Sequence, residues 1–143
     1  MADASAVDAA LVAKLLADAT LMAITTDGVY IDLAPQGCTK FVLVSQSAHE
    51  DAYTQPETSA FERFVYLVKA VTANVSGVDA KTAAARIHTL LQFGTLSATG
   101  YSLMTMRRLE DNGRVRHTEV DAASDRLHWQ HRGGLYEIEV QPS

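Results

Sequence analysis

Apolar residues recur at a helical spacing near the start of the chain. The stripe consists of Val7, Leu11, Leu15 and Ala19, with Val12 and Leu16 beside them. This spacing predicts an amphipathic helix that ends at about Asp18. Asp3 or Ser5 can cap its N-terminus, and Asp8 lies in the first turn, where the helix dipole favours a carboxylate.

Short β-rich runs follow this helix. Asp27-Gly28 is a turn signal, residues 29–33 form a short strand candidate, and Pro35 to Gly37 end it. Residues 40–47 are a second strand, whose apolar run at 41–44 predicts burial on both faces. Residues 48–60 are mostly polar and show no period, which predicts a long exposed loop.

The middle of the chain contains the longest strand candidate and a second helix. Residues 61–72 alternate between two faces and would span roughly 40 Å. Asp79 is the predicted N-cap of the helix that follows, and Gly94 is its predicted stop. The apolar stripe of this helix consists of Ala80, Ala83, Ala84, Ile87 and Leu91.

Turn residues in the last third of the chain predict a hairpin and a final strand. Residues 101–110 and 114–120 flank Asp111-Asn112-Gly113, and Asn-Gly is a strong hairpin signal. That register places Arg108 opposite His117. Residues 127–140 form the last strand, broken or bulged at Gly133-Gly134.

Together these elements predict an α+β fold with a mostly antiparallel sheet, two helices packed on one face, and long exposed hairpins. The length of 143 residues suits a single domain, residues 1–143. Hydrophobic residues make up 48% of the chain, which excludes disorder throughout. No apolar run reaches the ~18 residues of a membrane span, and residues 1–5 do not look like a secretory signal.

Charge is unevenly distributed along the chain. The formal net charge is −5, and this argues against a dedicated nucleic-acid binder. Four arginines nevertheless gather in the predicted hairpin, where they can contact phosphates or an acidic neighbouring protein. Alternatively the hairpin is simply solvated, with Glu110, Asp111 and Glu119 neutralising it. The four are Arg107, Arg108, Arg114 and Arg116.

Motifs of known chemistry are missing from the sequence. There is no Walker loop, GxGxxG, GxSxG or HExxH pattern. His128 and His131 resemble a metal pair, but residues three apart on a strand point to opposite faces. Glu137 and Glu139 share a face and could do acid–base work, although alternating glutamates more often serve solvation or subunit pairing. Cys38, the single cysteine, cannot form an internal disulfide, which indicates a reducing compartment or a protein indifferent to redox conditions. We expect no catalytic residue, cofactor or metal.

Several stretches carry a resemblance to a known family. They are Val-Tyr-Ile-Asp-Leu-Ala-Pro-Gln-Gly at 29–37, the strand at 40–47, the helix at 79–91, and Trp-Gln-His-Arg-Gly-Gly-Leu-Tyr-Glu-Ile-Glu-Val at 129–140. In the order and type of its elements, the chain resembles the tail-completion, or tail-terminator, proteins of long-tailed bacteriophages and related gene-transfer particles. The likeness covers nearly the whole chain, and most of it lies in residues 29–37 and in the terminal strand.

The resemblance implies a structural role in the virion neck, after assembly in the host cytoplasm. Such proteins form a ring, usually of six subunits, on the head-proximal end of the tail tube. The ring ends tube polymerisation and meets the head-completion or connector protein, and DNA passes through it without sequence-specific binding. The family supplies no catalytic residues. Candidate contacts with the major tail tube protein, with the connector or between subunits are Glu50, Asp51, Tyr53, Gln55, Glu57, Arg107, Arg108, Arg114 and Arg116.

Two other hypotheses remain open from the sequence. In the first, a small enzyme or ligand-binding domain uses the open face of the sheet, with Tyr66, Trp129, Tyr136 and Glu137 in one pocket. In the second, the arginine hairpin binds nucleic acid, although no aromatic residues alternate with its arginines to stack on bases.

Overall fold

The computed structural model describes residues 5–55, 58–74, 77–110, 114–120 and 128–142, and only the backbone at 51–55, 58–60, 74 and 114–120. It confirms an α+β fold with a mostly antiparallel sheet. The helices are α1 (Ser5–Leu16), α2 (Ala19–Ile24) and α3 (Val78–Leu91). The strands are β1 (Val29–Ile31), β2 (Lys40–Gln55), β3 (Thr58–Asn74), β4 (Tyr101–Arg108), β5 (Arg114–Val120) and β6 (His128–Pro142).

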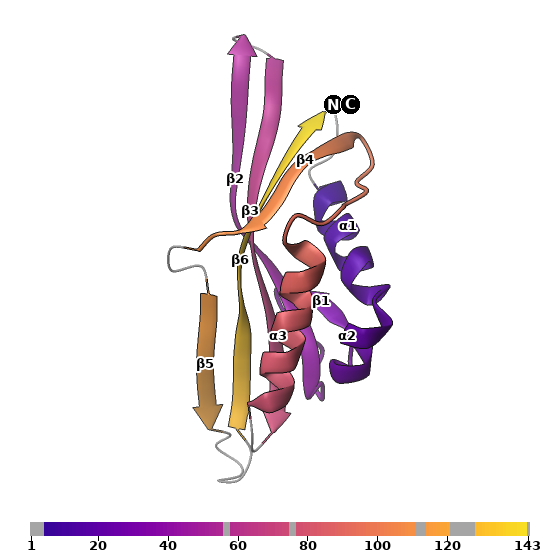
Figure 1. The fold of residues 1–143 in the computed structure, drawn as a ribbon, viewed down its shortest axis with the longest axis vertical. Helices are drawn as coiled ribbons and strands as arrows, with labels where there is room; N and C mark the ends of the chain where they lie inside the picture. The colour runs from indigo at the N-terminus through magenta and orange to yellow at the C-terminus, as the bar shows by residue number, and fades with distance from the viewer. Residues whose placement is uncertain (1–4, 56–57, 75–76, 111–113, 121–127, 143) are drawn as a thin grey trace.

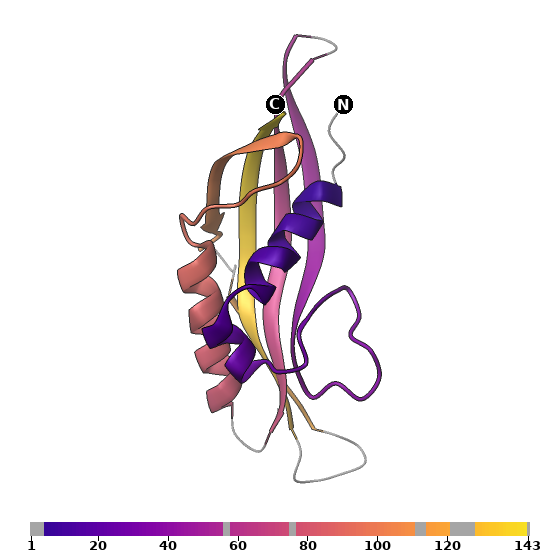
Figure 2. The same ribbon diagram turned by 90° about the vertical axis from the view of Figure 1, so that its right-hand side faces the viewer.

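The described strands form one sheet, with the helices on one of its faces (Figures 1 and 2). The strand order is β1-β2-β3-β6-β4, and β5 also pairs with β6. Among the described strands, only β1 is parallel to its neighbour, β2. Within the described ranges, no helix is long and apolar enough to cross a bilayer.

Residues 48–60 do not form the predicted loop. Residues 48–55 belong to β2 and residues 58–60 to β3, and the two strands pair as far as Gln55 and Thr58 and extend beyond the helices as a long arm (Figure 1). Register shifts follow Gln46, Ala52 and Tyr53. Such shifts interrupt the strict two-residue period by which a strand is recognised in a sequence.

The predicted hairpin between β4 and β5 is also wrong. Both strands pair with β6 instead, β4 along its C-terminal half and β5 along its N-terminal half. Arg108 therefore lies opposite Tyr136, and His117 lies opposite His131. The partner strand β6 is 15 residues long and serves both, which a local turn signal cannot reveal.

The expected break at Gly133-Gly134 is absent as well. The register between β3 and β6 continues without a shift from Leu67↔Leu135 to Lys69↔Gly133. The glycine pair instead marks where the other neighbour of β6 changes from β4 to β5. A Cβ on Gly133 would lie 2.1 Å from the Val68 carbonyl oxygen, so close backbone approach requires glycine there.

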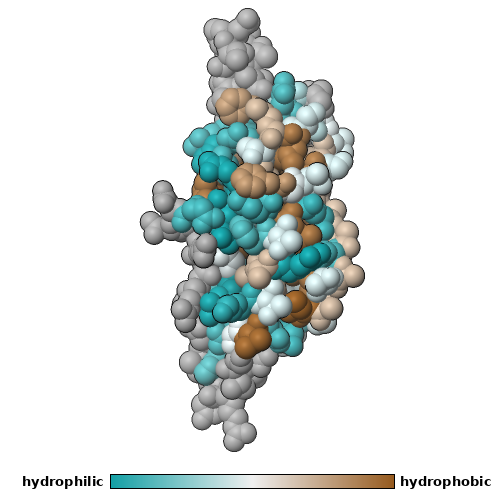
Figure 3. All heavy atoms as spheres, viewed as in Figure 1, coloured by the Kyte–Doolittle hydropathy of each residue, from teal (hydrophilic) through white to brown (hydrophobic). Residues whose placement is uncertain are grey.

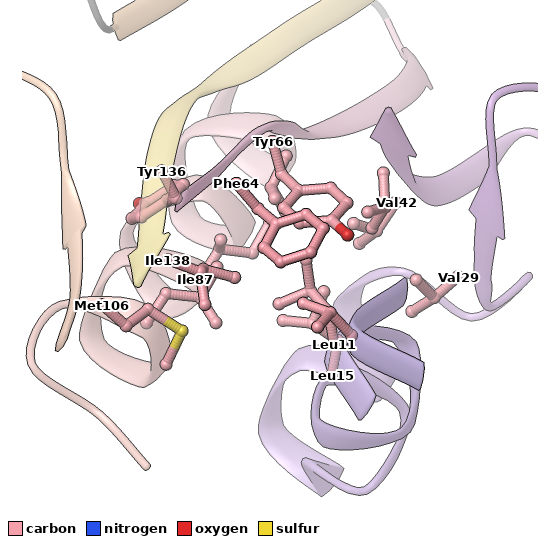
Figure 4. Packing of buried hydrophobic residues seen from close by; sticks show 14 of the residues in the cluster. Leu11, Leu15, Val29, Val42, Phe64, Tyr66, Ile87, Met106, Tyr136 and Ile138 are labelled. Atoms are coloured by element: carbon pink, nitrogen blue, oxygen red, sulfur yellow. The ribbon is translucent and has the colours of Figure 1, made fainter. Parts of the chain in front are cut away.

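The core lies between the helices and the sheet (Figure 4). The predicted stripe of the first helix is confirmed at Val7, Leu11 and Leu15, which are fully buried. It is wrong at Ala19, which is exposed and belongs to α2, and the neighbouring Leu16 is 46% exposed. The first helix ends at Leu16, however, and Asp18 caps the separate helix α2. The strands contribute buried aromatic and aliphatic side chains, the largest being Phe64, Tyr66, Met106, Tyr136 and Ile138.

Helix α3 packs its predicted stripe against the sheet, but its ends differ from the prediction. The buried residues are Ala80, Ala83, Ile87 and Leu91, whereas Ala84 is half-buried. Gly77, not Asp79, is the N-cap, and the Asp79 carboxylate instead accepts from Lys40 Nζ at 3.0 Å. At the other end Phe93 has the positive φ of 54°. Gly94 follows it and would place a Cβ 2.1 Å from the Leu90 carbonyl oxygen.

Candidate assembly surface

The face of the sheet opposite the described helices is a candidate contact surface, here called the open face. On β3 and β6 the residues that pack under the helices include Phe64, Tyr66 and Ile138. Because side chains alternate along a strand, Arg63 and Glu137 belong to the opposite, open face.

Four strands are joined on the open face by an ionic cluster. Arg63 of β3 donates from Nε and Nη2 to Glu137 Oε2 of β6, each at 2.9 Å. Arg107 of β4 approaches Glu137 Oε1 at 3.6 Å, and Glu50 of β2 lies 3.6 Å from Arg63 Nη1. The Glu137 side chain is only 5% exposed, so its two arginines replace most of its hydration. We call these four residues the ionic cluster.

Glu137 and its neighbour Glu139 titrate differently. Burial works to raise the pKa of Glu137, but the hydrogen bond with Glu139 and the pairing with Arg63 and Arg107 outweigh it and hold that pKa below its usual value. Burial raises the pKa of Glu139, and the hydrogen bond and charge of Glu137 raise it further. These opposite pKa shifts fit a pair in which Glu137 is a carboxylate held by arginines and Glu139 is a carboxyl group that keeps its proton more readily.

The predicted contact residues fall into three groups. Glu50 and Arg107 both belong to the ionic cluster. Arg108 lies apart from it, 13% exposed and 3.2 Å from Glu110. Asp51, Tyr53 and Gln55 lie on the arm, and Arg114 and Arg116 on β5, with only their backbones described, while Glu57 is outside the described residues.

The pocket expected around Tyr66, Trp129, Tyr136 and Glu137 does not form. Tyr66 and Tyr136 are buried on the helix side, where the Tyr66 hydroxyl donates to Asp8 and the Tyr136 hydroxyl lies 3.3 Å from His88 Nδ1 (Figure 4). Glu137 belongs to the other face, and Trp129, eight residues away on the same strand, shares it.

The two histidines of the predicted metal pair do not converge, and Cys38 lies apart from them in the sequence. His128 and His131 are three positions apart on β6, which places them on opposite faces. Among the described residues, no group of three or more His, Cys, Asp or Glu could hold a metal ion. Cys38 is partly buried, with its Sγ 4.0 Å from the Tyr30 hydroxyl.

Exposed apolar side chains gather at two places that the sequence pattern did not predict. One is a groove of about 460 Å³ between α1 and β1, lined by Leu16 and Ile31 among others. The second, at the opposite edge of the sheet, contains Phe93 and Met104. Figure 3 shows apolar side chains interrupting the polar surface on the side seen in Figure 1. Periodicity identifies apolar positions but not which of them stay in solvent.

Comparison with known proteins places the chain in a family. A family profile described as "Tail completion protein gp17" matches residues 9–128. The chain belongs to this tail completion family. The match confirms the resemblance over residues 9–128, which include residues 29–37, whereas residues 129–140 lie beyond it.

Two solved structures have a fold similar to that of this tail completion family member. A chain described as "Virion of native gene transfer agent (GTA) particle" is 21% identical, with 96% of each chain covered and a TM-score of 0.68. A second solved chain is 15% identical, with 99% of each chain covered and a TM-score of 0.55. At these identities the likeness concerns the fold alone. No curated protein matches the chain.

Proposed function

We propose that this protein is a structural component of a phage-type tail, and that it forms a ring on the head-proximal end of the tail tube. The ring ends tube polymerisation and offers a surface to the proteins that join head and tail. The family match over residues 9–128 carries the proposal. The similar fold of a chain in a gene transfer agent virion supports it.

The architecture is suited to a contact that repeats from subunit to subunit. A ring closes only when one patch meets a different patch on the neighbour. This sheet has two unlike edges, with β1 and the arm of β2 on one side and β4 and β5 on the other. The arm and the open face add surface for the tube protein and for the head-completion or connector protein.

The same surfaces are compatible with DNA passing through the ring without being held. Each chain carries a net charge of −5, which disfavours binding to phosphates. Two of the four arginines proposed to bind nucleic acid already face carboxylates, since Arg107 lies 3.6 Å from Glu137 and Arg108 3.2 Å from Glu110. We therefore propose that the protein acts by contact and performs no reaction.

Deletion of the gene in its phage, prophage or gene-transfer cluster tests the function. We expect overlong tubes, or tails without heads, in electron micrographs. A plasmid copy of the gene should restore tail length and head joining. Normal-length tails attached to heads in the deletion strain would refute the proposal.

A further inference from the structure

Two apolar patches occupy opposite edges of the molecule. The groove patch consists of Leu16 and Ile31, which line the groove and are 46% and 44% exposed. The edge patch consists of Phe93 and Met104, which are 73% and 51% exposed. β1 is at one end of the strand order and β4 is at the other. Large apolar side chains grouped in this way are typical of interaction sites.

The groove patch has room for an inserted side chain. Ala9, Val12 and Ala13 of α1 line the groove on one side, and Val29 and Ile31 of β1 line it on the other. The small alanine side chains fill little of the groove, whose volume is about 460 Å³. Because β1 ends the strand order, the outer side of its backbone has no strand partner among the described residues.

The exposed Phe93 side chain is attached to a strained backbone. Its φ of 54° is an outlier for a bulky residue, and its amide donates to the Met106 carbonyl at 2.7 Å. At 73% exposure the ring contributes little to the core of its own chain. The hydrogen bond to β4 holds the strained residue in place at the edge patch.

Charge supports a match between the two patches. Asp32 directly follows Ile31 and is exposed at the groove patch. Arg107 is three residues beyond Met104, and its side chain is 48% exposed although it lies 3.6 Å from Glu137. Opposite charges beside complementary apolar patches favour one relative orientation of the two surfaces.

We infer that the edge patch of one copy packs into the groove patch of the next copy, with Phe93 entering the groove between α1 and β1. The inference rests on the proposed ring and names the surfaces that build it. Two different patches on each copy give a head-to-tail contact, which can repeat around a ring.

Thiol crosslinking tests this contact in the full-length protein, both concentrated in solution and in purified particles. Cys38→Ser removes the native thiol, and Ile31→Cys with Phe93→Cys adds one thiol to each patch. A short bismaleimide should then link the double variant into a ladder of multimers. Each single variant alone should stay unlinked, while a mixture of the two should yield dimers. Val78→Cys replaces Phe93→Cys in the control, because Val78 is 65% exposed and outside both patches.

A second variant keeps the test decisive if the cysteines impair assembly. Asparagine tolerates positive φ, so Phe93→Asn should fold normally. We expect at least a tenfold drop in its incorporation into particles, with an unchanged thermal unfolding midpoint, whereas Val78→Asn should incorporate normally.

Three results would overturn the inference. They are particles that contain the double variant but show no ladder, dimers formed by one single variant, and unchanged incorporation of Phe93→Asn. Crosslinks to a different tail protein would likewise reject a second copy as the occupant. The proposed function fails separately, if deletion of the gene leaves tails of normal length joined to heads.

Discussion

Individual residues decide how closely the strands and helices of this protein approach. Gly133 lets the backbones of β3 and β6 lie in contact, and Asp18 ties α2 to α3 with its side chain. The structure shows the role of both residues, whereas the sequence alone shows only a glycine and an aspartate. Their importance depends on neighbours more than 60 residues away.

Gly133→Ala should lower the free energy of unfolding by about 3 kcal/mol or more. The new Cβ would lie 2.1 Å from the Val68 carbonyl oxygen and 2.5 Å from Lys69 Cα, and neither backbone atom can move without breaking the β3–β6 ladder. Urea unfolding of the purified protein measures the change. Gly77→Ala is the control, because its Cβ would lie closest to the ends of two side chains, those of Gln130 at 3.3 Å and Arg132 at 3.7 Å, and to no backbone atom among these nearest contacts. Equal stabilities of the two variants would contradict this account.

Asp18 should make stability depend on pH in the acid range. Its carboxylate accepts from Arg86 Nε at 2.8 Å and Nη2 at 2.7 Å, and from the Leu21 amide at 2.9 Å. These contacts, the Arg86 hydrogen bonds first, lower its pKa from 3.8 to about 2. The folded state therefore holds the proton more weakly than the unfolded chain. The resulting stability is complete above about pH 4 and is lost as the pH falls through 2.

The Asp18→Asn variant tests this dependence because asparagine can still cap α2. We expect a loss of about 1–2 kcal/mol at pH 7, less than the pKa change alone implies, since Arg86 is one-third exposed. The difference from the original protein should shrink as the pH approaches 2. Denaturant midpoints at several pH values measure it, and Arg86→Met should behave in the same way. A difference that stays constant down to pH 2 would argue against the ion pair.

At the scale of elements, the strength of the local pattern decided what could be predicted. Helices α1 and α3 have regular apolar stripes, and their buried residues were largely predictable. The arm was missed because three register shifts interrupt its alternation. The pairing of β4 and β5 was missed because both bind β6, and a turn signal reports only on adjacent segments. The ionic cluster was missed for a similar reason, because Arg63 and Glu137 are 74 residues apart.

Tyr66→Phe should loosen α1 from the sheet while leaving α3 in place. The Tyr66 hydroxyl donates to Asp8 of α1, and its burial and this bond both raise the pKa of the phenol. Loss of the bond should cost about 0.5–1.5 kcal/mol. Hydrogen exchange should accelerate at the amides of α1 and remain unchanged at those of α3. Equal acceleration in both helices would indicate global destabilisation instead.

At the scale of the whole molecule, the arm lies away from the core that stabilises the fold. The buried cluster joins the helices to the parts of the strands beneath them, and Figure 1 shows the arm reaching past the helices. Assembly and folding should therefore be separable by mutation. This separation is expected of a protein whose work is contact with other copies and partners.

Shortening the arm should impair assembly and spare the fold. Replacing residues 52–61 with Asn-Gly joins Asp51 to Glu62, which are already register partners, through a favoured two-residue turn. We expect a cooperative thermal unfolding transition within a few degrees of the original, and loss of incorporation into tails. A second variant with the same deletion but two additional residues in the turn serves as a control for strain in the turn. Normal incorporation of both would remove the arm from the assembly surface.

The pairing of β6 has one more consequence, for how the sheet can open. On one side β6 pairs with β3 along almost its full length. On the other side it pairs with two shorter strands, β4 and β5, placed end to end. Among the described strands β5 has no neighbour but β6, so detaching it breaks a single ladder. We expect β5 to open at a lower free energy than the rest of the fold. The protein can thus lose the pairing of β5 with β6 while the rest of the sheet and the core stay folded.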